Sequence, residues 1–370
     1  MKIYYDENIP YAEQFFSDFG QLTPFAGRAV SAQQVSDADV LLVRSITQVN
    51  QQLLADNHSL QFVGTATIGF DHVDRQYLAQ RNVTFTNAPG CNAVSVAEYV
   101  LSAIMVMSER LPFILQDKTV GIVGAGNTGT ALARKLAALG VEYKLCDPIL
   151  EASGDPRMFS SLDEVCQCDI ISLHVPKTHS GEHATFHMFD NERLQQLSKQ
   201  QILINACRGE VIDNKALLAL KSKQLAPYLV MDVWENEPNI LEELMPYCDI
   251  ATPHIAGYSL EGKARGTEML YQALAQTLGR PTNKRLIDFL PKADMALPNM
   301  ASIHLPDQLR ETIFAVYDVR RDDQIMRSQL ASRGFDWLRK NYPERRELSA
   351  LSLPQSYHQI TAIYRQLGFA

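Results

Sequence analysis

Arg208, Glu237 and His254 are the residues of this chain whose types and settings could do chemistry together. Each follows a short apolar run that is typical of a buried strand, and open α/β sheets bind their ligands at the carboxyl ends of the strands. A guanidinium offers a carboxylate two parallel donors. An imidazole can accept a hydroxyl proton near neutral pH, and a carboxylate bonded to its far nitrogen fixes its tautomer. The trio therefore suits the oxidation of a hydroxy acid.

Each of the three residues also has a purely structural interpretation when it is taken alone. Arg208 could cap the carboxyl end of a helix, Glu237 could be a solvated loop charge, and His254 could be a turn histidine with its hydrogen bonds satisfied. The catalytic interpretation depends on their occurring together, at successive strand ends, behind a nucleotide-binding motif.

That motif is the G-x-G-x-x-G formed by Gly124, Gly126 and Gly129. An apolar run at 120–123 precedes it, and a stretch rich in Ala and Leu, 130–139, follows it. Strand, glycine turn and helix in this order form a dinucleotide fingerprint, in which the pyrophosphate lies on the free N–H groups of the helix. The pattern predicts a nucleotide-binding domain.

The next apolar run, at 141–146, ends in Asp147, 18 residues beyond Gly129. A carboxylate at this place can accept hydrogen bonds from both ribose hydroxyls and would repel a 2′-phosphate. The sequence therefore favours NAD over NADP as the cofactor.

The strand candidates alternate with helical segments, which predicts an α/β fold with parallel sheets. We expect two Rossmann-like domains, a substrate-binding domain at 1–95 that is completed by 257–285 and an NAD-binding domain at 96–256. A small third domain should occupy 286–370, where prolines punctuate short strands and amphipathic helices. Within the first two domains, strands are expected at 38–43, 61–65, 120–123, 141–146, 169–173, 201–205 and 228–231, and helices at 10–19, around 50–56, at 94–109 and at 259–278.

The length, net charge and cysteine content of the chain favour some classes of protein over others. The chain has 370 residues, which is enough for two or three domains. Its 34 basic and 42 acidic residues give a net charge of −8, which argues against nucleic acid or an anionic membrane as a partner. Six cysteines without a paired spacing, and charged residues at the amino terminus, favour a reduced, cytoplasmic protein.

The motifs together resemble the D-isomer-specific 2-hydroxyacid dehydrogenases. The resemblance covers roughly residues 40–280, and the segment after Arg285 resembles the C-terminal dimerisation domain of one branch of that family. The motifs that carry it are Gly124–Gly129 with Asp147, His174-Val-Pro-Lys-Thr178, Asn205-Ala-Cys-Arg-Gly209, Asp232-Val-Trp-Glu-Asn-Glu-Pro238 and Pro253-His-Ile-Ala-Gly257.

The resemblance implies a role for individual residues. Arg208 would bind the substrate carboxylate, His254 would be the acid/base, and Glu237 would be its partner. The substrate would also meet Ser45, Thr67 and Tyr258. The residues implied in NAD binding are Gly124, Gly126, Asn127, Gly129, Asp147, Val175, Ala206, Cys207, Arg208, Asp232 and Gly257.

The activity implied is NAD-dependent oxidation of a phosphorylated D-2-hydroxy acid by a homodimer. Alternatives on the same scaffold are a dehydrogenase for another such acid, for example 3-phosphoglycerate, and a non-catalytic, NAD-sensing corepressor. Arg44, which precedes Ser45 at a strand end, could meet the substrate phosphate or form a structural ion pair.

Two features fit the family pattern less well. Glu210 places an extra negative charge beside Arg208, where it could weaken the attraction for a carboxylate. Residues 68–70, Ile-Gly-Phe, are bulkier than expected for a substrate pocket. Apart from the family pattern, His179, His183 and His187 have the spacing of one helix face and of some metal sites, but Ser180-Gly181 would break that helix and no carboxylate or cysteine completes a ligand set. We therefore expect no metal.

Overall fold

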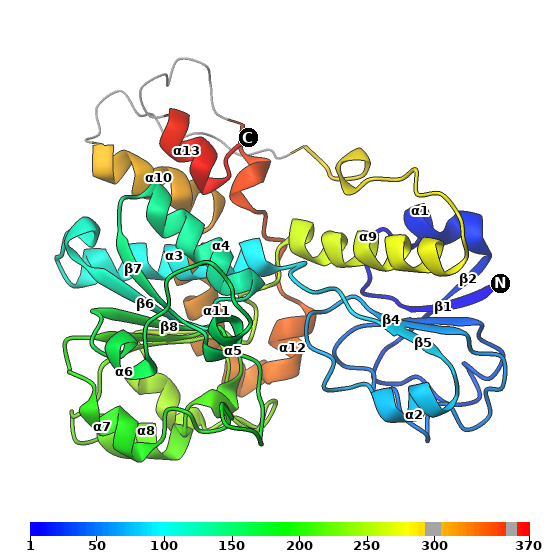
Figure 1. The fold of residues 1–370 in the computed structure, drawn as a ribbon, viewed down its shortest axis with the longest axis horizontal. Helices are drawn as coiled ribbons and strands as arrows, with labels where there is room; N and C mark the ends of the chain where they lie inside the picture. The colour runs from blue at the N-terminus through cyan, green and yellow to red at the C-terminus, as the bar shows by residue number, and fades with distance from the viewer. Residues whose placement is uncertain (293–304, 353–360) are drawn as a thin grey trace. The chain divides into compact units, whose positions relative to one another are not determined.

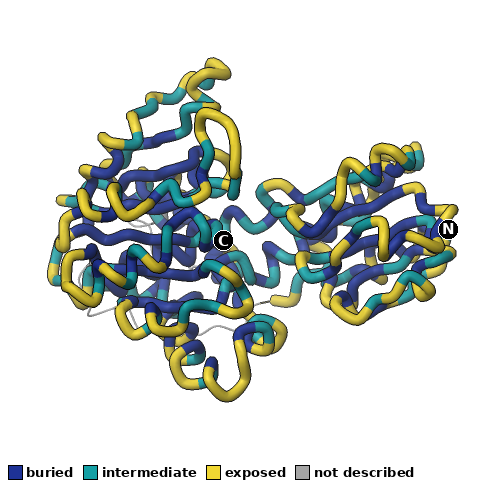
Figure 2. Tube along the Cα trace, turned by 90° about the horizontal axis from the view of Figure 1, so that it is seen from below, coloured by how far each residue is buried: buried dark blue, intermediate teal, exposed yellow. Residues whose placement is uncertain are grey.

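The computed structural model describes residues 1–292, 305–352 and 361–370, and it divides into two compact units. The first comprises residues 1–92 and 259–292, and the second comprises 93–258 together with the described residues from 305 onward. Both contain an all-parallel sheet, as the alternation of strands and helices predicts. Figure 2 shows buried segments, in dark blue, through the centre of each unit. Most strands consist largely of buried residues.

The first unit has a five-stranded sheet in the order β2-β1-β3-β4-β5. Apolar side chains of α9 and α1 cover one face, and those from the loops before and after β3 and from α2 cover the other; Figure 1 shows α1 and α9 on one side and α2 on the other. The elements are β1 (Lys2–Asp6), α1 (Ala12–Phe16), β2 (Gln21–Phe25), β3 (Val40–Val43), β4 (Phe62–Thr65), α2 (Arg75–Gln80), β5 (Thr84–Thr86) and α9 (Leu260–Thr277), with 3-10 turns at Ser17–Phe19 and Leu286–Asp288.

The second unit has a six-stranded sheet in the order β11-β10-β9-β8-β6-β7. One core cluster lies between the sheet and α3, α4, α10 and α13, and another lies beneath α7, α8, α11 and α12. The strands are β6 (Thr119–Val123), β7 (Glu142–Cys146), β8 (Ile170–Leu173), β9 (Ile202–Asn205), β10 (Tyr228–Met231) and β11 (Ile250–Ala251).

Helices surround this second sheet on both faces, as Figure 1 shows for α3 and α4 above it and α7 and α8 below it. They are α3 (Ala93–Arg110), α4 (Asn127–Ala138), α5 (Pro148–Ala152), α6 (Leu162–Val165), α7 (Asn191–Gln196), α8 (Asn214–Lys221), α10 (Leu305–Val316), α11 (Val319–Arg333), α12 (Phe335–Lys340) and α13 (Thr361–Leu367). The 3-10 turns of this unit are Leu115–Asp117, Gly209–Val211, Glu242–Tyr247 and Leu348–Ala350. Among the described residues, no helix is both long and apolar enough to cross a membrane.

Most predicted elements are present, but one predicted helix is absent, and short elements such as β2, β5, β11 and α2 were not predicted. The helix expected around 50–56 is a series of turns. The edge strand β2 escaped prediction because it contains Pro24, which a central strand would not tolerate. The long helices were located well: α3 and α9 differ from expectation by only one residue at either end.

The carboxyl-terminal segment packs on the nucleotide unit and does not separate from it as a third unit. The chain itself covers most of the large apolar side chains of this segment: Ile313, Tyr317, Phe335 and Leu338 are at most 3 % exposed, while Trp337 stays 39 % exposed. The four buried side chains therefore do not need a partner subunit to cover them.

A buried ion pair strengthens this attachment. Nζ of Lys135 in α4 lies 3.0 Å from Glu98 Oε1 in α3 and donates to the carbonyl of Leu367, 2.6 Å away. The other carboxylate oxygen of Glu98 accepts from the N–H of Leu348. Burial raises the pKa of Glu98 to about 7, against the opposing pull of Lys135. Removing the terminal segment would therefore expose a buried charge pair as well as apolar surface.

Candidate active site

Three neighbouring strands of the second sheet end beside one another and carry the predicted catalytic residues. Arg208 follows β9, Glu237 follows β10, and His254 follows β11. The backbone links the three loops, because Asp232 N–H donates to Asn205 O and His254 N–H donates to Asp232 O, at 2.9 and 2.6 Å. The sheet thus gathers side chains that lie up to 46 positions apart in the sequence.

His254 and Glu237 form a close pair. His254 Nδ1 lies 2.6 Å from Glu237 Oε2, and the other carboxylate oxygen accepts from the N–H of Trp234 at 2.9 Å. Burial alone would raise the pKa of Glu237, but attraction and hydrogen bonding from His254, helped by Arg339 and Trp234 N–H, lower it. An ionised carboxylate can only accept, so Nδ1 is the protonated nitrogen and Nε2 is the one left for chemistry.

The loop that carries His254 is held by the buried carboxylate of Asp232. This group accepts from Thr252 Oγ1 at 2.7 Å and from the N–H groups of Ile255 and Ala256 at 2.8 and 2.9 Å. His254 has a φ of 57°, which a non-glycine residue adopts only where its surroundings enforce it. Asp232, expected to contact the cofactor, thus already orients the histidine loop.

Arg208 is half-buried, and one guanidinium N–H donates to the carbonyl of Cys207 at 2.7 Å. Its own carbonyl accepts from the side chain of Asn205. The following Gly209 cannot be replaced, since a Cβ there would come within 1.9 Å of the backbone of Trp234. The loop after β9 is therefore pressed against the loop that bears Glu237.

Glu210 does not leave an uncompensated charge beside Arg208. Its carboxylate pairs with Nζ of Lys177 at 2.8 Å. Lys177, 33 positions away in the sequence, therefore neutralises the negative charge that we expected to weaken the attraction of Arg208 for a carboxylate.

The glycine fingerprint has the geometry that a dinucleotide needs. Gly124 has a φ of 91°, and Gly129 approaches the carbonyl of Gly124 so closely that a Cβ would lie 2.0 Å from it. A Cβ on Gly126, the residue before α4, would meet no atom within 4 Å. This open space in front of a helix amino terminus fits a pyrophosphate.

Asp147 lies where a ribose would be recognised. Its two oxygens accept from the N–H groups of Ala125 and Leu150, at 2.9 and 3.1 Å, and a carboxylate has further lone pairs for two hydroxyls. Arg157, which sequence reasoning missed, lies beside this turn. Four of its five N–H donors bond to Asp155, to the Ala125 carbonyl and to Thr130. The guanidinium is therefore already occupied by the protein and is not available to bind a 2′-phosphate.

The other residues implied in cofactor binding follow the ends of strands in the same unit. Val175 follows β8 and packs beside Gly124. Ala206 and Cys207 follow β9, and Gly257 follows β11. The Cys207 thiol is buried 3.2 Å from Asn205 Oδ1, and burial raises its pKa to about 11, so it is no nucleophile. All six cysteines are free and buried.

The residues implied in substrate binding divide between the two units. Arg44 and Ser45 follow β3, and Thr67 follows β4, in the first unit, whereas Tyr258 belongs to the second. Arg44 Nη1 is shielded from solvent and has no hydrogen-bond partner within the described part of the chain. The hydroxyl of Thr67 donates to the carbonyl of Gly69 at 2.8 Å. Of the two interpretations of Arg44, a ligand contact fits this arrangement better than an ion pair.

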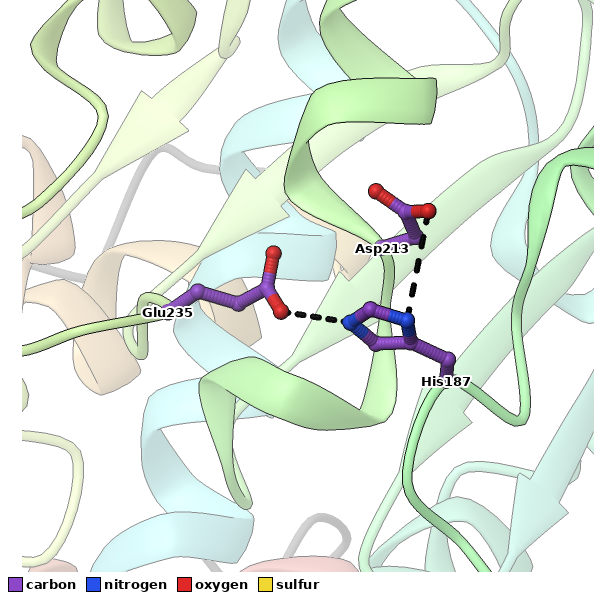
Figure 3. A group of neighbouring side chains, drawn as sticks. All are labelled: His187, Asp213 and Glu235. Atoms are coloured by element: carbon purple, nitrogen blue, oxygen red, sulfur yellow. Dashed lines mark hydrogen bonds and ion pairs between the residues drawn. The ribbon is translucent and has the colours of Figure 1, made fainter.

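His187 bridges two carboxylates that the local sequence does not reveal. Figure 3 shows its ring between Glu235 and Asp213, with Nε2 2.6 Å from Glu235 Oε1 and Nδ1 3.9 Å from Asp213 Oδ2. Our expectation that no carboxylate accompanies this histidine was wrong, because both come from distant loops. Each ring nitrogen of His187 faces a different carboxylate, so the histidine connects the loop before α8, which carries Asp213, with the loop that carries Glu235 and continues to Glu237. We call this arrangement a brace between the loops.

Comparisons with known proteins agree with this geometry. Residues 100–256 match the model for the D-isomer specific 2-hydroxyacid dehydrogenase, NAD binding domain, and residues 289–368 match a domain of unknown function, DUF3410. The chain is 53 % identical to the erythronate-4-phosphate dehydrogenase of Colwellia psychrerythraea and 52 % identical to that of Tolumonas auensis, over 100 % of this chain and 99 % of each relative.

Solved structures share the fold at lower identity. The D-lactate dehydrogenase of Aquifex aeolicus, complexed with NAD and lactic acid, has a TM-score of 0.62 at 24 % identity and covers 75 % of this chain and 96 % of its own. The NAD⁺-bound 3-phosphoglycerate dehydrogenase of Entamoeba histolytica has a TM-score of 0.64 at 21 % identity, covering 76 % and 96 %.

Two glycine substitutions test the cofactor site. We expect Gly126→Ala to keep the melting temperature of the parent and to weaken NAD binding by about tenfold or more, because the new methyl fills only the space for the pyrophosphate. Gly129→Ala should lower the melting temperature by several degrees, since overpacking costs about 1–3 kcal/mol. Calorimetry and NAD titration measure both. Undiminished NAD affinity in Gly126→Ala would show that the pyrophosphate does not approach this residue.

Proposed function

This chain belongs to the D-isomer specific 2-hydroxyacid dehydrogenase family, and we propose that it oxidises 4-phospho-D-erythronate to (R)-3-hydroxy-2-oxo-4-phosphooxybutanoate with NAD. The step belongs to the biosynthesis of pyridoxal 5′-phosphate. Two relatives above 50 % identity over the full length carry the name of that dehydrogenase. The observation that carries the chemistry is the 2.6 Å contact between His254 Nδ1 and Glu237 Oε2, in the unit that also contains the intact dinucleotide fingerprint.

His254 is the base in this proposal. With Nδ1 held by Glu237, Nε2 accepts the proton of the C2 hydroxyl while the C2–H bond breaks, and the C2–O bond becomes a carbonyl. NAD, when bound, supplies the acceptor for the hydride that leaves C2. Glu237 stabilises the imidazolium that forms, and the Asp232 carboxylate keeps the loop still during the transfer.

Arg208 anchors the substrate carboxylate, and Arg44 binds the phosphate at the other end of the substrate. A guanidinium can hold a carboxylate by two parallel bonds, which aligns C2 for the reaction. The phosphate binds remote from C2, and its binding energy improves that alignment. Ser45, Thr67 and Tyr258 would meet the hydroxyl groups between the two anchors.

Oxidation of 3-phosphoglycerate is the alternative that shares these anchors, and an NAD-sensing corepressor is the alternative without turnover. The presence of Arg208, Glu237 and His254 in one strand-end cluster favours an enzyme over a sensor. We further propose that the protein acts in the cytoplasm, where its six free, buried thiols stay reduced, and that it is a homodimer formed through the carboxyl-terminal segment.

The catalytic pair makes a kinetic prediction. We expect His254→Ala to lower kcat by about 10²–10⁴-fold while NAD still binds, because the base is needed only for proton transfer. Glu237→Gln should cost less and move the acidic limb of the pH profile to lower pH, since the amide no longer favours the protonated ring. Both follow from initial rates of NADH formation across pH. A pH profile unchanged by Glu237→Gln would remove Glu237 from the pair.

The two arginines should differ in their dependence on the phosphate. Arg44→Met is expected to lower kcat/KM for 4-phosphoerythronate by about 10–100-fold, the value of a charged hydrogen bond, and to spare erythronate. Arg208→Met should harm both substrates, which share the carboxylate. Equal losses on the two substrates in Arg44→Met would refute the phosphate assignment, and faster turnover of 3-phosphoglycerate by the unmodified enzyme would refute the substrate.

Assembly is tested by sedimentation. We expect the full chain to sediment as a dimer and Trp337→Glu, which places a charge on the exposed apolar side chain of α12, to shift it toward the monomer without changing its melting temperature. A full chain that stays monomeric at micromolar concentration would exclude the homodimer. A dimer that withstands Trp337→Glu would place the interface away from α12.

A further inference from the structure

The carboxyl-terminal segment contacts the loop that carries the catalytic histidine. Arg339 in α12 donates to the hydroxyl of Tyr258 at 3.0 Å, and Arg345 donates to the carbonyl of Ala256 at 3.0 Å. The ring of Tyr342 meets that of Tyr258 edge to face, with 5.9 Å between centroids. These contacts come from residues that match a domain of unknown function, and they fall two to four positions after His254.

Arg345 and Tyr342, which contact the loop, are themselves fixed by interactions in the protein core. Arg345 is 1 % exposed, donates to the carbonyl of Ser95 in α3 at 2.6 Å, and lies 3.5 Å over the ring of Tyr317. The hydroxyls of Tyr317 and Tyr342 both donate to Asp322 in α11. A buried, hydrogen-bonded network of this kind is rigid, so it can fix the loop that it touches.

Arg339 brings a positive charge to the catalytic pair. Its guanidinium lies over the ring of Tyr258, 5.7 Å from the centroid, and its Nε is shielded from solvent. The printed contacts of the Glu237 carboxylate are His254 Nδ1 and the N–H of Trp234. The positive charge of Arg339 in α12 also lowers the pKa of Glu237 by electrostatic attraction. Charges shielded from water interact more strongly than surface charges do.

We propose that the carboxyl-terminal segment positions the catalytic loop, and that Arg339 is the positioning residue that holds Tyr258 and brings a positive charge to the loop that bears His254. The proposal rests on the proposed function, since it assigns these groups a part in proton transfer. It gives the segment a role within its own chain, separate from any role in dimerisation.

The sign of the effect follows from the charges. Burial works to raise the pKa of Glu237, and Arg339 is one of the groups that lower it. Without that cation, the pair takes up protons at a higher pH, because the carboxylate neutralises more readily and the imidazolium meets less repulsion. The acidic limb should therefore move to higher pH, opposite to the change expected for Glu237→Gln.

Three variants of the full-length enzyme separate charge from packing. Arg339→Met should lower kcat and move the acidic limb upward by about one pH unit, the size that one neighbouring charge gives. Arg339→Lys keeps the charge and should restore the position of the limb. Lys340→Met removes an exposed charge from the adjacent position of α12 and should leave the profile in place.

A readout without substrate distinguishes failure of this inference from failure of the proposed function. The NMR shift of the His254 ring, followed against pH in the free protein, should report protonation beginning at higher pH in Arg339→Met than in the parent and in Arg339→Lys. If 4-phosphoerythronate is not turned over but this shift appears, only the substrate is wrong. If Arg339→Met loses melting temperature and activity with no change in either pH curve, Arg339 is merely structural and the inference fails.

Discussion

The buried carboxylate of Asp232 is the constraint on which the active site depends. A carboxylate 1 % exposed to solvent is costly unless it is fully hydrogen-bonded, and this one accepts from Thr252, Ile255 and Ala256. These three donors lie on either side of His254 in the sequence, so their hydrogen bonds to the Asp232 carboxylate fix the conformation of the loop. The left-handed backbone of His254 persists because the surrounding bonds over-determine it. The hydrogen bonds that satisfy the buried Asp232 carboxylate are therefore the same bonds that orient His254.

The remaining parts of the second unit converge on that loop. Parallel strands β9, β10 and β11 bring Arg208, Glu237 and His254 to one edge of the sheet, and the brace of His187 with Glu235 ties a further loop to the same edge. The carboxyl-terminal segment supports the loop from behind through Arg345. Its buried connection to Lys135 in α4 also joins it to the helix that follows the glycine turn. The residues proposed for cofactor binding and for proton transfer therefore belong to one compact unit.

Local patterns in the sequence predicted the parts of the structure that depend on near neighbours. The fingerprint glycines, the strands of the nucleotide unit and the helix that Ser259 caps follow from spacing, periodicity and turn chemistry within about 20 residues. The catalytic trio could be proposed because Arg208 and Glu237 follow strands that the sequence predicts, and because the family motif at 253–257 contains His254. The failures were also local in origin: Pro24 concealed β2, and residues 50–56, which include Leu53, Leu54 and Ala55, were predicted as a helix but form turns.

Residues that act through distant partners could not be predicted. Arg157 reaches the glycine turn from 32 positions away, and Arg339 reaches Tyr258 from 81. The carboxylates of His187 lie 26 and 48 positions along the chain. Each of these side chains reads as an ordinary surface charge in its own segment, and only the assembled sheet shows what it contacts. The compensation of Glu210 by Lys177 belongs to the same class.

The central claim is that Glu237 fixes the proton of His254 on Nδ1 and leaves Nε2 as the base. Nitrogen-15 NMR of the histidine-labelled protein, with the His254 signals assigned by their loss in His254→Gln, reports the tautomer directly at a pH where the ring is neutral. We expect a protonated Nδ1 with an Nδ1–H signal shifted downfield by its short bond to the carboxylate, and an unprotonated Nε2. A neutral ring protonated on Nε2 would contradict it, because the nitrogen required to accept the substrate proton would already carry one.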